Sequence, residues 1–226
     1  LSVIKNGEPF VKSGFNYSIG RPQQNIKHQL IKAETHYHFN DGNRLQWTIA
    51  QQLNNRNEYD LHIPRNDSIA ALNKPQLTFK LNTLTNDLIW DHKPLAKKLV
   101  GQIGVSTLYQ YNLMSGRPLI PNFNQFNIGL FWIERYVSNG WELEAGVRYD
   151  YRTLTTHRFV GKSKVSNEFN FSNFSGTIGA AKNLTQQLSI KLNAGTAWRP
   201  PNVSELFSDG VHHGAASFEK GDSTIT

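Results

Sequence analysis

The chain of 226 residues contains no cysteine and a single methionine. The absence of cysteine excludes disulfides, thiolate metal sites and cysteine nucleophiles. Hydrophobic residues make up only 38% of the chain, and no stretch approaches the roughly 18 consecutive apolar residues that a transmembrane helix requires. A helical membrane protein is therefore excluded. A membrane β-barrel is not, because its strands alternate apolar and polar residues and this signal disappears when hydropathy is averaged.

Several classes of function also leave no trace in the sequence. The net charge is +7, but lysine and arginine are scattered rather than clustered, and no recognition helix or aromatic RNA-binding motif is present, so we predict no nucleic-acid partner. No serine elbow, glycine-rich phosphate loop or metalloprotease helix motif is present. We therefore predict no enzyme, no cofactor and no metal site. Leu1 is not an initiator methionine and no signal-peptide core follows it, which favours a fragment.

The clearest strand pattern runs from residue 141 to residue 152. Trp141, Leu143 and the other odd positions are apolar or aromatic, whereas the even positions are charged or glycine. The even positions are Glu142, Glu144, Gly146, Arg148, Asp150 and Arg152. A strict period of two predicts a β-strand, and five charges among six positions are too many for a dry core. One face of this strand must contact water.

Similar patterns recur along the chain and predict an antiparallel all-β fold. Residues 122–137 alternate in the same way and lead through Ser138-Asn139-Gly140 into the strand above, which is typical of a hairpin. Residues 31–40 and 45–52 form a second predicted hairpin around Asp41-Gly42-Asn43. Further strands are predicted at 76–83, 101–112, 174–181 and 188–197, while 87–98 show no clear pattern. No amphipathic helix of ten residues or more interrupts the series.

The length of the strands and connections favours a barrel in a membrane. Several predicted strands reach the roughly nine to eleven residues needed to span a bilayer, against five or six in soluble sheets. Aromatic residues gather near the strand ends, as in the girdles of outer-membrane barrels. Turns near 41–43, 138–140 and 183–186 are short, and links at 59–74, 113–121 and 156–168 are expected to be long. In such barrels the long links are extracellular.

Specific segments resemble the TonB-dependent outer-membrane receptors, particularly those of the Bacteroidota type. The strongest are Glu142–Asp150 and Ala197–Phe207, which includes Arg199, Pro200, Pro201 and Glu205. Further strong matches are Ile19–Pro22 with Gln24 and His28–Leu30, Asn55–Asp60 and Leu119–Phe123. Together they extend the resemblance over nearly the whole chain.

The resemblance implies an antiparallel transmembrane β-barrel segment in the outer membrane of a Gram-negative bacterium. Residues 1–226 would supply about 8–10 strands of a roughly 22-stranded barrel, with the plug domain and the C-terminal strands absent. Its partners would be outer-membrane lipid, a nutrient ligand such as a ferric siderophore, and TonB, which contacts the absent plug and TonB box. Haem, cobalamin and oligosaccharides are alternative cargoes of the same fold.

Each candidate site can be explained by a functional role or by a structural or solvent-facing role. His212 and His213 are candidate ligand contacts in an extracellular loop, but adjacent histidines on an extended loop point apart and suit a structural role better. His36 and His38 share one face at roughly 7 Å, wider than a compact metal site favours. The charged residues Glu142, Glu144, Arg148, Asp150 and Arg152 are expected to line the lumen and contact the plug rather than act as acid and base.

Two other classes of protein remain compatible with these patterns. A soluble extracellular β-protein could bind glycans through surface aromatic residues. A carbohydrate-active β-enzyme would need two carboxylates converging at about 5–9.5 Å in a cleft. Outward-facing aromatic residues on a continuous curved wall would favour the receptor over both.

Overall fold

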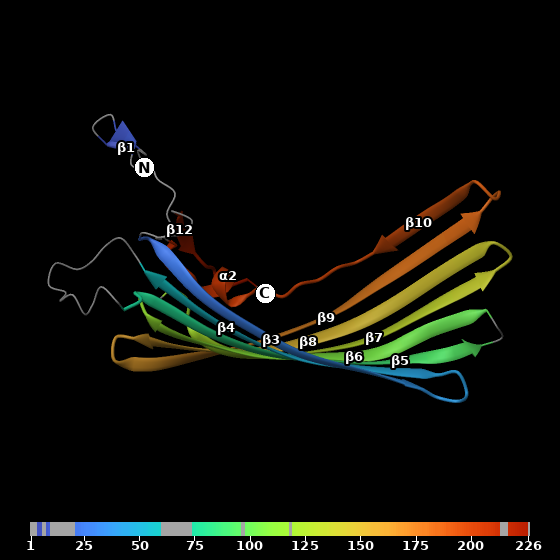
Figure 1. Ribbon diagram of the computed structural model, residues 1–226, viewed down its shortest axis with the longest axis horizontal. Coiled ribbons are helices and arrows are strands. Elements are labelled where there is room, and N and C mark those ends of the chain that lie inside the picture. The colour runs from blue at the N-terminus through green and yellow to red at the C-terminus, as the bar shows by residue number, and fades with distance from the viewer. Residues whose placement is uncertain are drawn as a thin grey trace.

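The computed structural model describes residues 4–5, 8–9, 21–59, 74–95, 98–117, 119–212 and 217–225. It is dominated by one antiparallel sheet of eight strands that curves like part of a barrel wall (Figure 1). Each strand pairs with its neighbours in sequence, in the order β10-β9-β8-β7-β6-β5-β4-β3. The strands are β3 (Gln23–His38), β4 (Arg44–Tyr59), β5 (Leu77–Leu95), β6 (Leu99–Gly116), β7 (Asn122–Ser138), β8 (Trp141–Val160), β9 (Ser163–Asn183) and β10 (Ser189–Gly195).

Short elements accompany the sheet. A five-residue helix, α2 (Val203–Phe207), precedes the hairpin of β11 (Asp209–His212) and β12 (Ser217–Lys220). A second small hairpin pairs β1 (Ile4–Lys5) with β2 (Glu8–Pro9). Helix α2 lies inside the curve of the large sheet (Figure 1). Within the described residues, no helix has the length and apolar character needed to cross a membrane.

The register separates apolar and polar side chains onto opposite faces of the sheet. One row of directly paired residues crosses six strands and is entirely apolar or aromatic: Trp47, Leu88, Val105, Leu130, Tyr149 and Phe174. The next residue along each strand belongs to the opposite face, where an equivalent row reads Thr48, Asp87, Ser106, Gly129, Asp150 and Asn173. The alternation predicted from the sequence is therefore maintained across β4 to β9.

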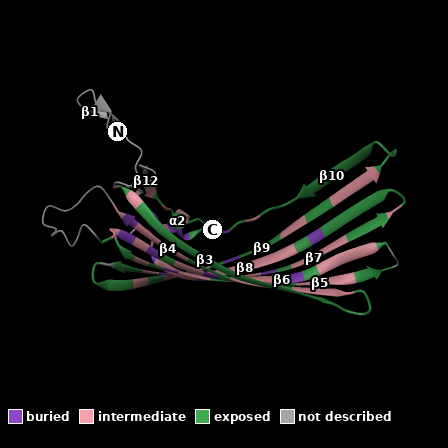
Figure 2. Cartoon of the chain, viewed as in Figure 1, coloured by how far each residue is buried: buried purple, intermediate pink, exposed green. Residues whose placement is uncertain are grey.

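The apolar face is the convex one, and it is exposed. Leu154 lies on the same face of β8 as Asp150, because alternate residues share a face, and it packs against Val203 and Leu206 of α2 inside the curve. The polar face is therefore concave. On the convex face, Trp132, Val147 and Phe174 are 53%, 58% and 75% exposed. Figure 2 shows that few residues of the wall are buried and that several of them lie near α2.

The convex apolar band has the height of a bilayer. On β8 it runs from Trp141 to Tyr151, which is roughly 33 Å along the strand at about 3.3 Å per residue. A strand tilted by about 40° places its ends roughly 25 Å apart across a membrane, the usual height of the apolar band of an outer-membrane barrel. Strands β3 to β9 have 16 to 21 residues, so they continue beyond that band.

The structure corrects several predicted boundaries. The link expected at 156–168 is a two-residue turn, because β8 continues to Val160 and β9 begins at Ser163. Gly161 permits this turn with its φ of 63°. Residues 87–95, which showed no clear pattern, complete β5.

The predicted division of the sheet into two ends is otherwise maintained. The strand ends at Tyr59 and Leu77, at Gly116 and Asn122, and at Val160 and Ser163 lie at one end of the sheet, and the turns at 39–43, 139–140 and 184–188 lie at the other (Figure 1). The link after Leu113 is shorter than expected, since β6 continues to Gly116. Most of the link after Tyr59 lies outside the described residues.

Candidate functional site

An arginine and an aspartate on β8 form a two-pronged ion pair on the concave face. Arg148 Nε donates to both carboxylate oxygens of Asp150 at 2.9 and 2.8 Å, and Nη2 donates to Oδ1 at 2.7 Å. The pair lies over Gly129 of β7, which is bonded in register to Asp150. A Cβ atom at Gly129 would overlap Arg148 Nη2 and lie 2.6 Å from Asp150 Oδ1. The missing side chain makes room for the pair.

A second glycine supports the aromatic ring beside this pair. Phe131 is paired with Gly104 of β6, and its ring occupies the space that a Cβ atom at Gly104 would need. The guanidinium carbon of Arg148 lies 5.9 Å from the centre of the Phe131 ring, within the range of a cation–π contact. Glycine, ring and ion pair thus form one continuous layer on the concave face.

Substitution of Gly129 by alanine should disturb this layer. The added methyl group must displace the guanidinium or shift β7, and overpacking of this kind costs about 1–3 kcal/mol of unfolding free energy. Gly176→Ala is the matched control, since a Cβ atom there meets only the Gly146 carbonyl oxygen at 3.3 Å. Urea unfolding in detergent measures both variants. Equal losses would show that the layer over Gly129 is not tightly packed.

Arg152 lies on the same face of β8 as Arg148 and Asp150. Among the described residues, no carboxylate forms a hydrogen bond with it. Its Nε donates to Asn127 Oδ1 at 2.9 Å and its Nη1 to the Pro201 carbonyl at 3.4 Å. Both partners are neutral, so they hold the guanidinium in place without a hydrogen-bonded carboxylate to neutralise its positive charge. Such a group favours an anion in the space in front of it.

The segment after β10 crosses the concave face and ends in α2. Asn202 caps the helix: its Oδ1 accepts from the Glu205 backbone N–H at 3.0 Å, and Glu205 Oε2 accepts from the Asn202 N–H at 2.8 Å. This reciprocal pair is a capping box. Arg199 adds a two-pronged ion pair to Glu205, at 2.9 and 2.7 Å. Arg199 and Glu205 therefore hold the turn that contains Pro200 and Pro201.

An apolar cluster fastens this segment to the sheet. Val203 and Leu206 are 4% and 2% exposed and pack against Leu154 of β8 and Phe171 of β9. The partly buried residues around them are Ile120, Phe123, Phe169, Trp198 and Phe207. A five-residue helix has little stability of its own, so burial of this cluster is what keeps α2 on the concave face.

The Arg199–Glu205 ion pair makes the attachment of α2 sensitive to acid, because the pair is lost when Glu205 is protonated. Hydrogen bonds from Arg199, and then from the Asn202 backbone, lower the pKa of Glu205 from 4.5 to about 2. A lowered pKa contributes stability that is complete above the ordinary value, declines as the pH falls below about 4.5 and is lost below about 2. The protection of the α2 amides against hydrogen exchange, relative to the unfolded chain, should decline over the same pH range. In Glu205→Gln the same amides should exchange faster at pH 7 and lose this dependence; a wild-type profile without it would contradict the assignment.

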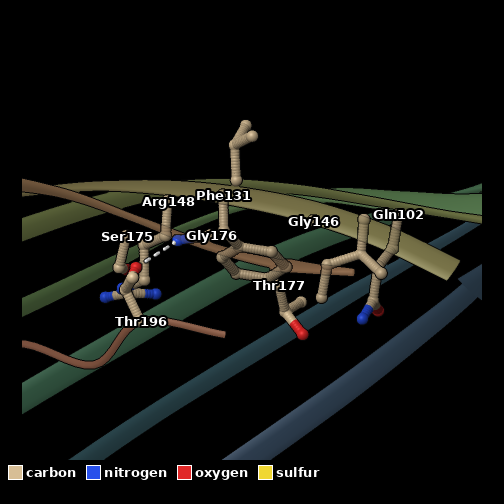
Figure 3. A pocket seen from close by; sticks show the side chains of 10 residues that line it. Gln102, Phe131, Gly146, Arg148, Ser175, Gly176, Thr177 and Thr196 are labelled. Atoms are coloured by element: carbon tan, nitrogen blue, oxygen red, sulfur yellow. Dashed lines mark hydrogen bonds between the residues drawn. The ribbon is translucent and has the colours of Figure 1, made fainter. Parts of the chain in front are cut away.

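Two hollows lie on the concave face beside these groups. The first, of about 410 Å³, is lined by residues of β6 to β9, including Phe131, Ile133, Arg148 and Thr177 (Figure 3). Thr196 closes one side, and its Oγ1 accepts from the Gly176 N–H at 3.1 Å. The second, of about 310 Å³, is lined by Asn127, Arg148, Asp150, Tyr151, Arg152, Trp198, Arg199 and Pro200. The second hollow therefore brings three arginines together.

The structure brings some of the predicted site residues together and separates others. Arg148, Asp150, Arg152 and Arg199 line one hollow. Glu142 and Glu144 lie on the same face farther toward the short turns, where Glu142 pairs with Arg135 at 3.3 Å.

The predicted histidines form no site that the structure describes. His212 ends β11, and its side chain, like the whole of His213, lies outside the described residues. His36 bonds Glu34 at 2.8 Å. Among the described residues no group of three or more potential ligands is placed to hold a metal ion.

Several residues of the site were not singled out from the sequence. Asn127 shows no pattern of its own, and Trp198 carried a signal only as part of the Ala197–Phe207 resemblance. The role of each depends on contacts between segments far apart in the chain. Gly104 and Gly129 did carry a signal, because glycine inside a strand often marks the close approach of another group.

Comparisons with known proteins agree with this architecture. Residues 7–224 match the family model described as TonB dependent receptor-like, beta-barrel. A solved structure of a double mutant of the Serratia marcescens hemophore receptor HasR, in complex with its hemophore HasA and heme, is similar with a TM-score of 0.51 and 17% identity. The similarity covers 89% of this chain and 40% of that receptor. No curated protein matches in sequence. The chain belongs to the family of TonB-dependent receptor-like β-barrels.

Proposed function

We propose that the chain forms part of an outer-membrane receptor that imports a scarce nutrient, an iron–siderophore complex, with energy supplied through TonB. The observation that carries the proposal is the segregation of side chains between the two faces of the wall. A convex face of exposed apolar and aromatic residues suits lipid, and a concave face with ion pairs and hydrogen-bonded polar groups suits a water-filled or plugged lumen.

Within this proposal, the eight strands are part of a larger barrel. The outer edges of β3 and β10 pair with no other strand that the structure describes. In the whole barrel they would pair with further strands, because open sheet edges are not tolerated in lipid. The chain corresponds to 40% of the length of the similar hemophore receptor, which is compatible with a plug domain and additional strands in the whole protein. The concave charges, from Glu142 to Arg152, would face that plug.

The arginine-lined hollow supports an anionic cargo. Arg148 and Arg199 are neutralised by Asp150 and Glu205, but Arg152 bonds only neutral partners. The hollow therefore keeps one uncompensated positive charge. Iron(III) chelated by carboxylate or catecholate oxygens forms anionic complexes, which this charge would attract from the entrance.

Haem is the second candidate cargo. The similar receptor structure contains a hemophore and heme, and the two carboxylates of haem would also suit an uncompensated arginine. The two cargoes can be supplied separately as iron sources, so transport measurements distinguish them.

The test is uptake by a Gram-negative strain that lacks its own iron receptors and expresses the full-length receptor. Iron-55 bound to siderophores, and haem as sole iron source, are supplied in parallel, with a strain lacking TonB as the control. TonB-dependent accumulation of a ferric siderophore supports the proposal, and growth on haem alone favours the second cargo. A soluble glycan-binding protein would show neither, and would lack the heat-modifiable gel migration of a barrel.

A further inference from the structure

The convex face carries a basic groove beside the apolar band. A hollow of about 440 Å³ lies across β3 to β6, and its lining includes Lys27, Leu53, Asn55, Lys80, Tyr111 and Leu113. All six face outward, on the side of Trp47 and Leu88, because they are an even number of residues from convex positions on their strands. The groove lies toward the end of the sheet at which β4 ends at Tyr59 and β5 begins at Leu77.

The register places the two lysines on either side of a single asparagine. Lys27 pairs with Asn55, Asn55 pairs with Lys80, and Lys80 pairs with Leu113. Two strand spacings put the lysine backbones roughly 10 Å apart. Flexible four-carbon stems of this length allow both ammonium groups to meet on one small anion.

No acidic group competes for these lysines. Neither ammonium forms an ion pair with any residue that the structure describes. Every outward position on β3 to β6 is free of aspartate and glutamate, whereas the concave face of the same strands carries Glu34, Glu58, Asp87 and Asp91. The two positive charges are therefore left for a group from outside the chain.

The rest of the groove combines a hydrogen-bond donor with apolar walls. Tyr111 Oη accepts from Asn82 Nδ2 at 3.1 Å, which leaves the phenolic hydrogen free to donate. Leu53 and Leu113 are 41% and 54% exposed. The next residues toward the band are Leu84 and Tyr109, which pair directly and are also exposed. A molecule with an anionic head and an apolar tail matches this sequence of charges, donor and apolar surface.

We propose that this groove binds the phosphate of an outer-leaflet lipid headgroup. Lys27 and Lys80 would contact the phosphate oxygens, Tyr111 would donate a third bond, and the acyl chains would lie along Leu84, Tyr109 and the band below. This site rests on the proposed membrane placement of the convex face. Phosphate is favoured over a carboxylate because it accepts from three donors that approach from different directions.

The experiment compares phosphatidic acid with dioleoylglycerol, the same lipid without its phosphate, on the full-length receptor in non-ionic detergent. Native mass spectrometry counts the bound lipids. The test variant is Lys27→Gln/Lys80→Gln, and the control is Lys164→Gln/Lys191→Gln, which removes the same charge elsewhere. At about a fivefold effect per lysine near the membrane surface, the test variant should bind phosphatidic acid roughly thirtyfold more weakly than wild type.

The site would be overturned by equal loss in both double variants, by unchanged binding in the test variant, or by equal binding of dioleoylglycerol. Complete displacement by millimolar inorganic phosphate would also overturn it, because the ligand would then be a soluble anion. Heat-modifiable migration is recorded for every variant. A variant without this migration has lost its barrel and tests the proposed membrane fold. A variant that keeps the migration but binds no lipid tests the groove itself.

Discussion

Replacing Ile178 by arginine is expected to destabilise the folded barrel by about 2–4 kcal/mol, whereas the same change at its neighbour Thr177 should cost less than about 1 kcal/mol. Both positions lie on β9 and both are exposed, but they face opposite sides. Ile178 is 65% exposed on the convex face, within the apolar band. A guanidinium there must leave water for hydrocarbon. At position 177 it enters the polar concave side, near Glu144.

Urea unfolding of the two variants in lipid vesicles measures this difference. Each contains the same new side chain one residue from the other, so propensity and size effects cancel. Similar losses in both variants would contradict the assignment of the convex face to lipid. A larger loss for Thr177→Arg would mean that the concave face, and not the convex face, contacts lipid.

Truncation of Leu206 to alanine should release α2 from the concave face while leaving the sheet folded. Leu206 is 2% exposed among Leu154, Phe171 and Val203. Removing a buried leucine side chain typically costs about 2–5 kcal/mol of stability. A helix of five residues is not stable on its own, so nothing within α2 offsets that loss. The amides of Leu206 and Ser208, which donate within α2, should exchange at least about thirtyfold faster.

Hydrogen exchange followed by mass spectrometry distinguishes local release from general unfolding. Leu184→Ala is the control, because Leu184 is 52% exposed in a short turn and its truncation removes the same atoms. Protection of β8 and β9 should persist in both variants. If β8 loses protection together with α2, the cluster stabilises the wall itself and not only the attached segment.

The sequence predicts the wall because its main signal is local. A period of two needs only neighbouring residues, and the contrast between lipid and lumen is strong over positions such as 141–152. The prediction failed where this contrast between the two faces is absent. Beyond the band, both faces of a strand meet water, so residues 156–160 and 163–168 lose the apolar contrast and resembled a loop. They are strand because they pair with each other, which no single segment reveals.

The concave site was predicted in its components but not in its arrangement. Arg148, Asp150 and Arg152 were assigned to the polar face by alternation, and Arg199 and Glu205 by resemblance to a family. Their meeting around Asn127 and Pro201 depends on a chain crossing from β10 back over β8, which is a long-range contact. Leu154 and Phe171 are buried for the same reason, although their places on strands with a wet face give no indication of it.

The strictly sequential pairing of β3 to β10 also bears on how such a wall is inherited. Adding or removing one strand would return the chain on the wrong side of the membrane and exchange every following loop with a turn. Adding or removing a hairpin leaves the direction of all other strands, and the face that each side chain occupies, unchanged. Diversification of this architecture by gene duplication is therefore expected to proceed two strands at a time, as the even strand numbers of bacterial barrels indicate.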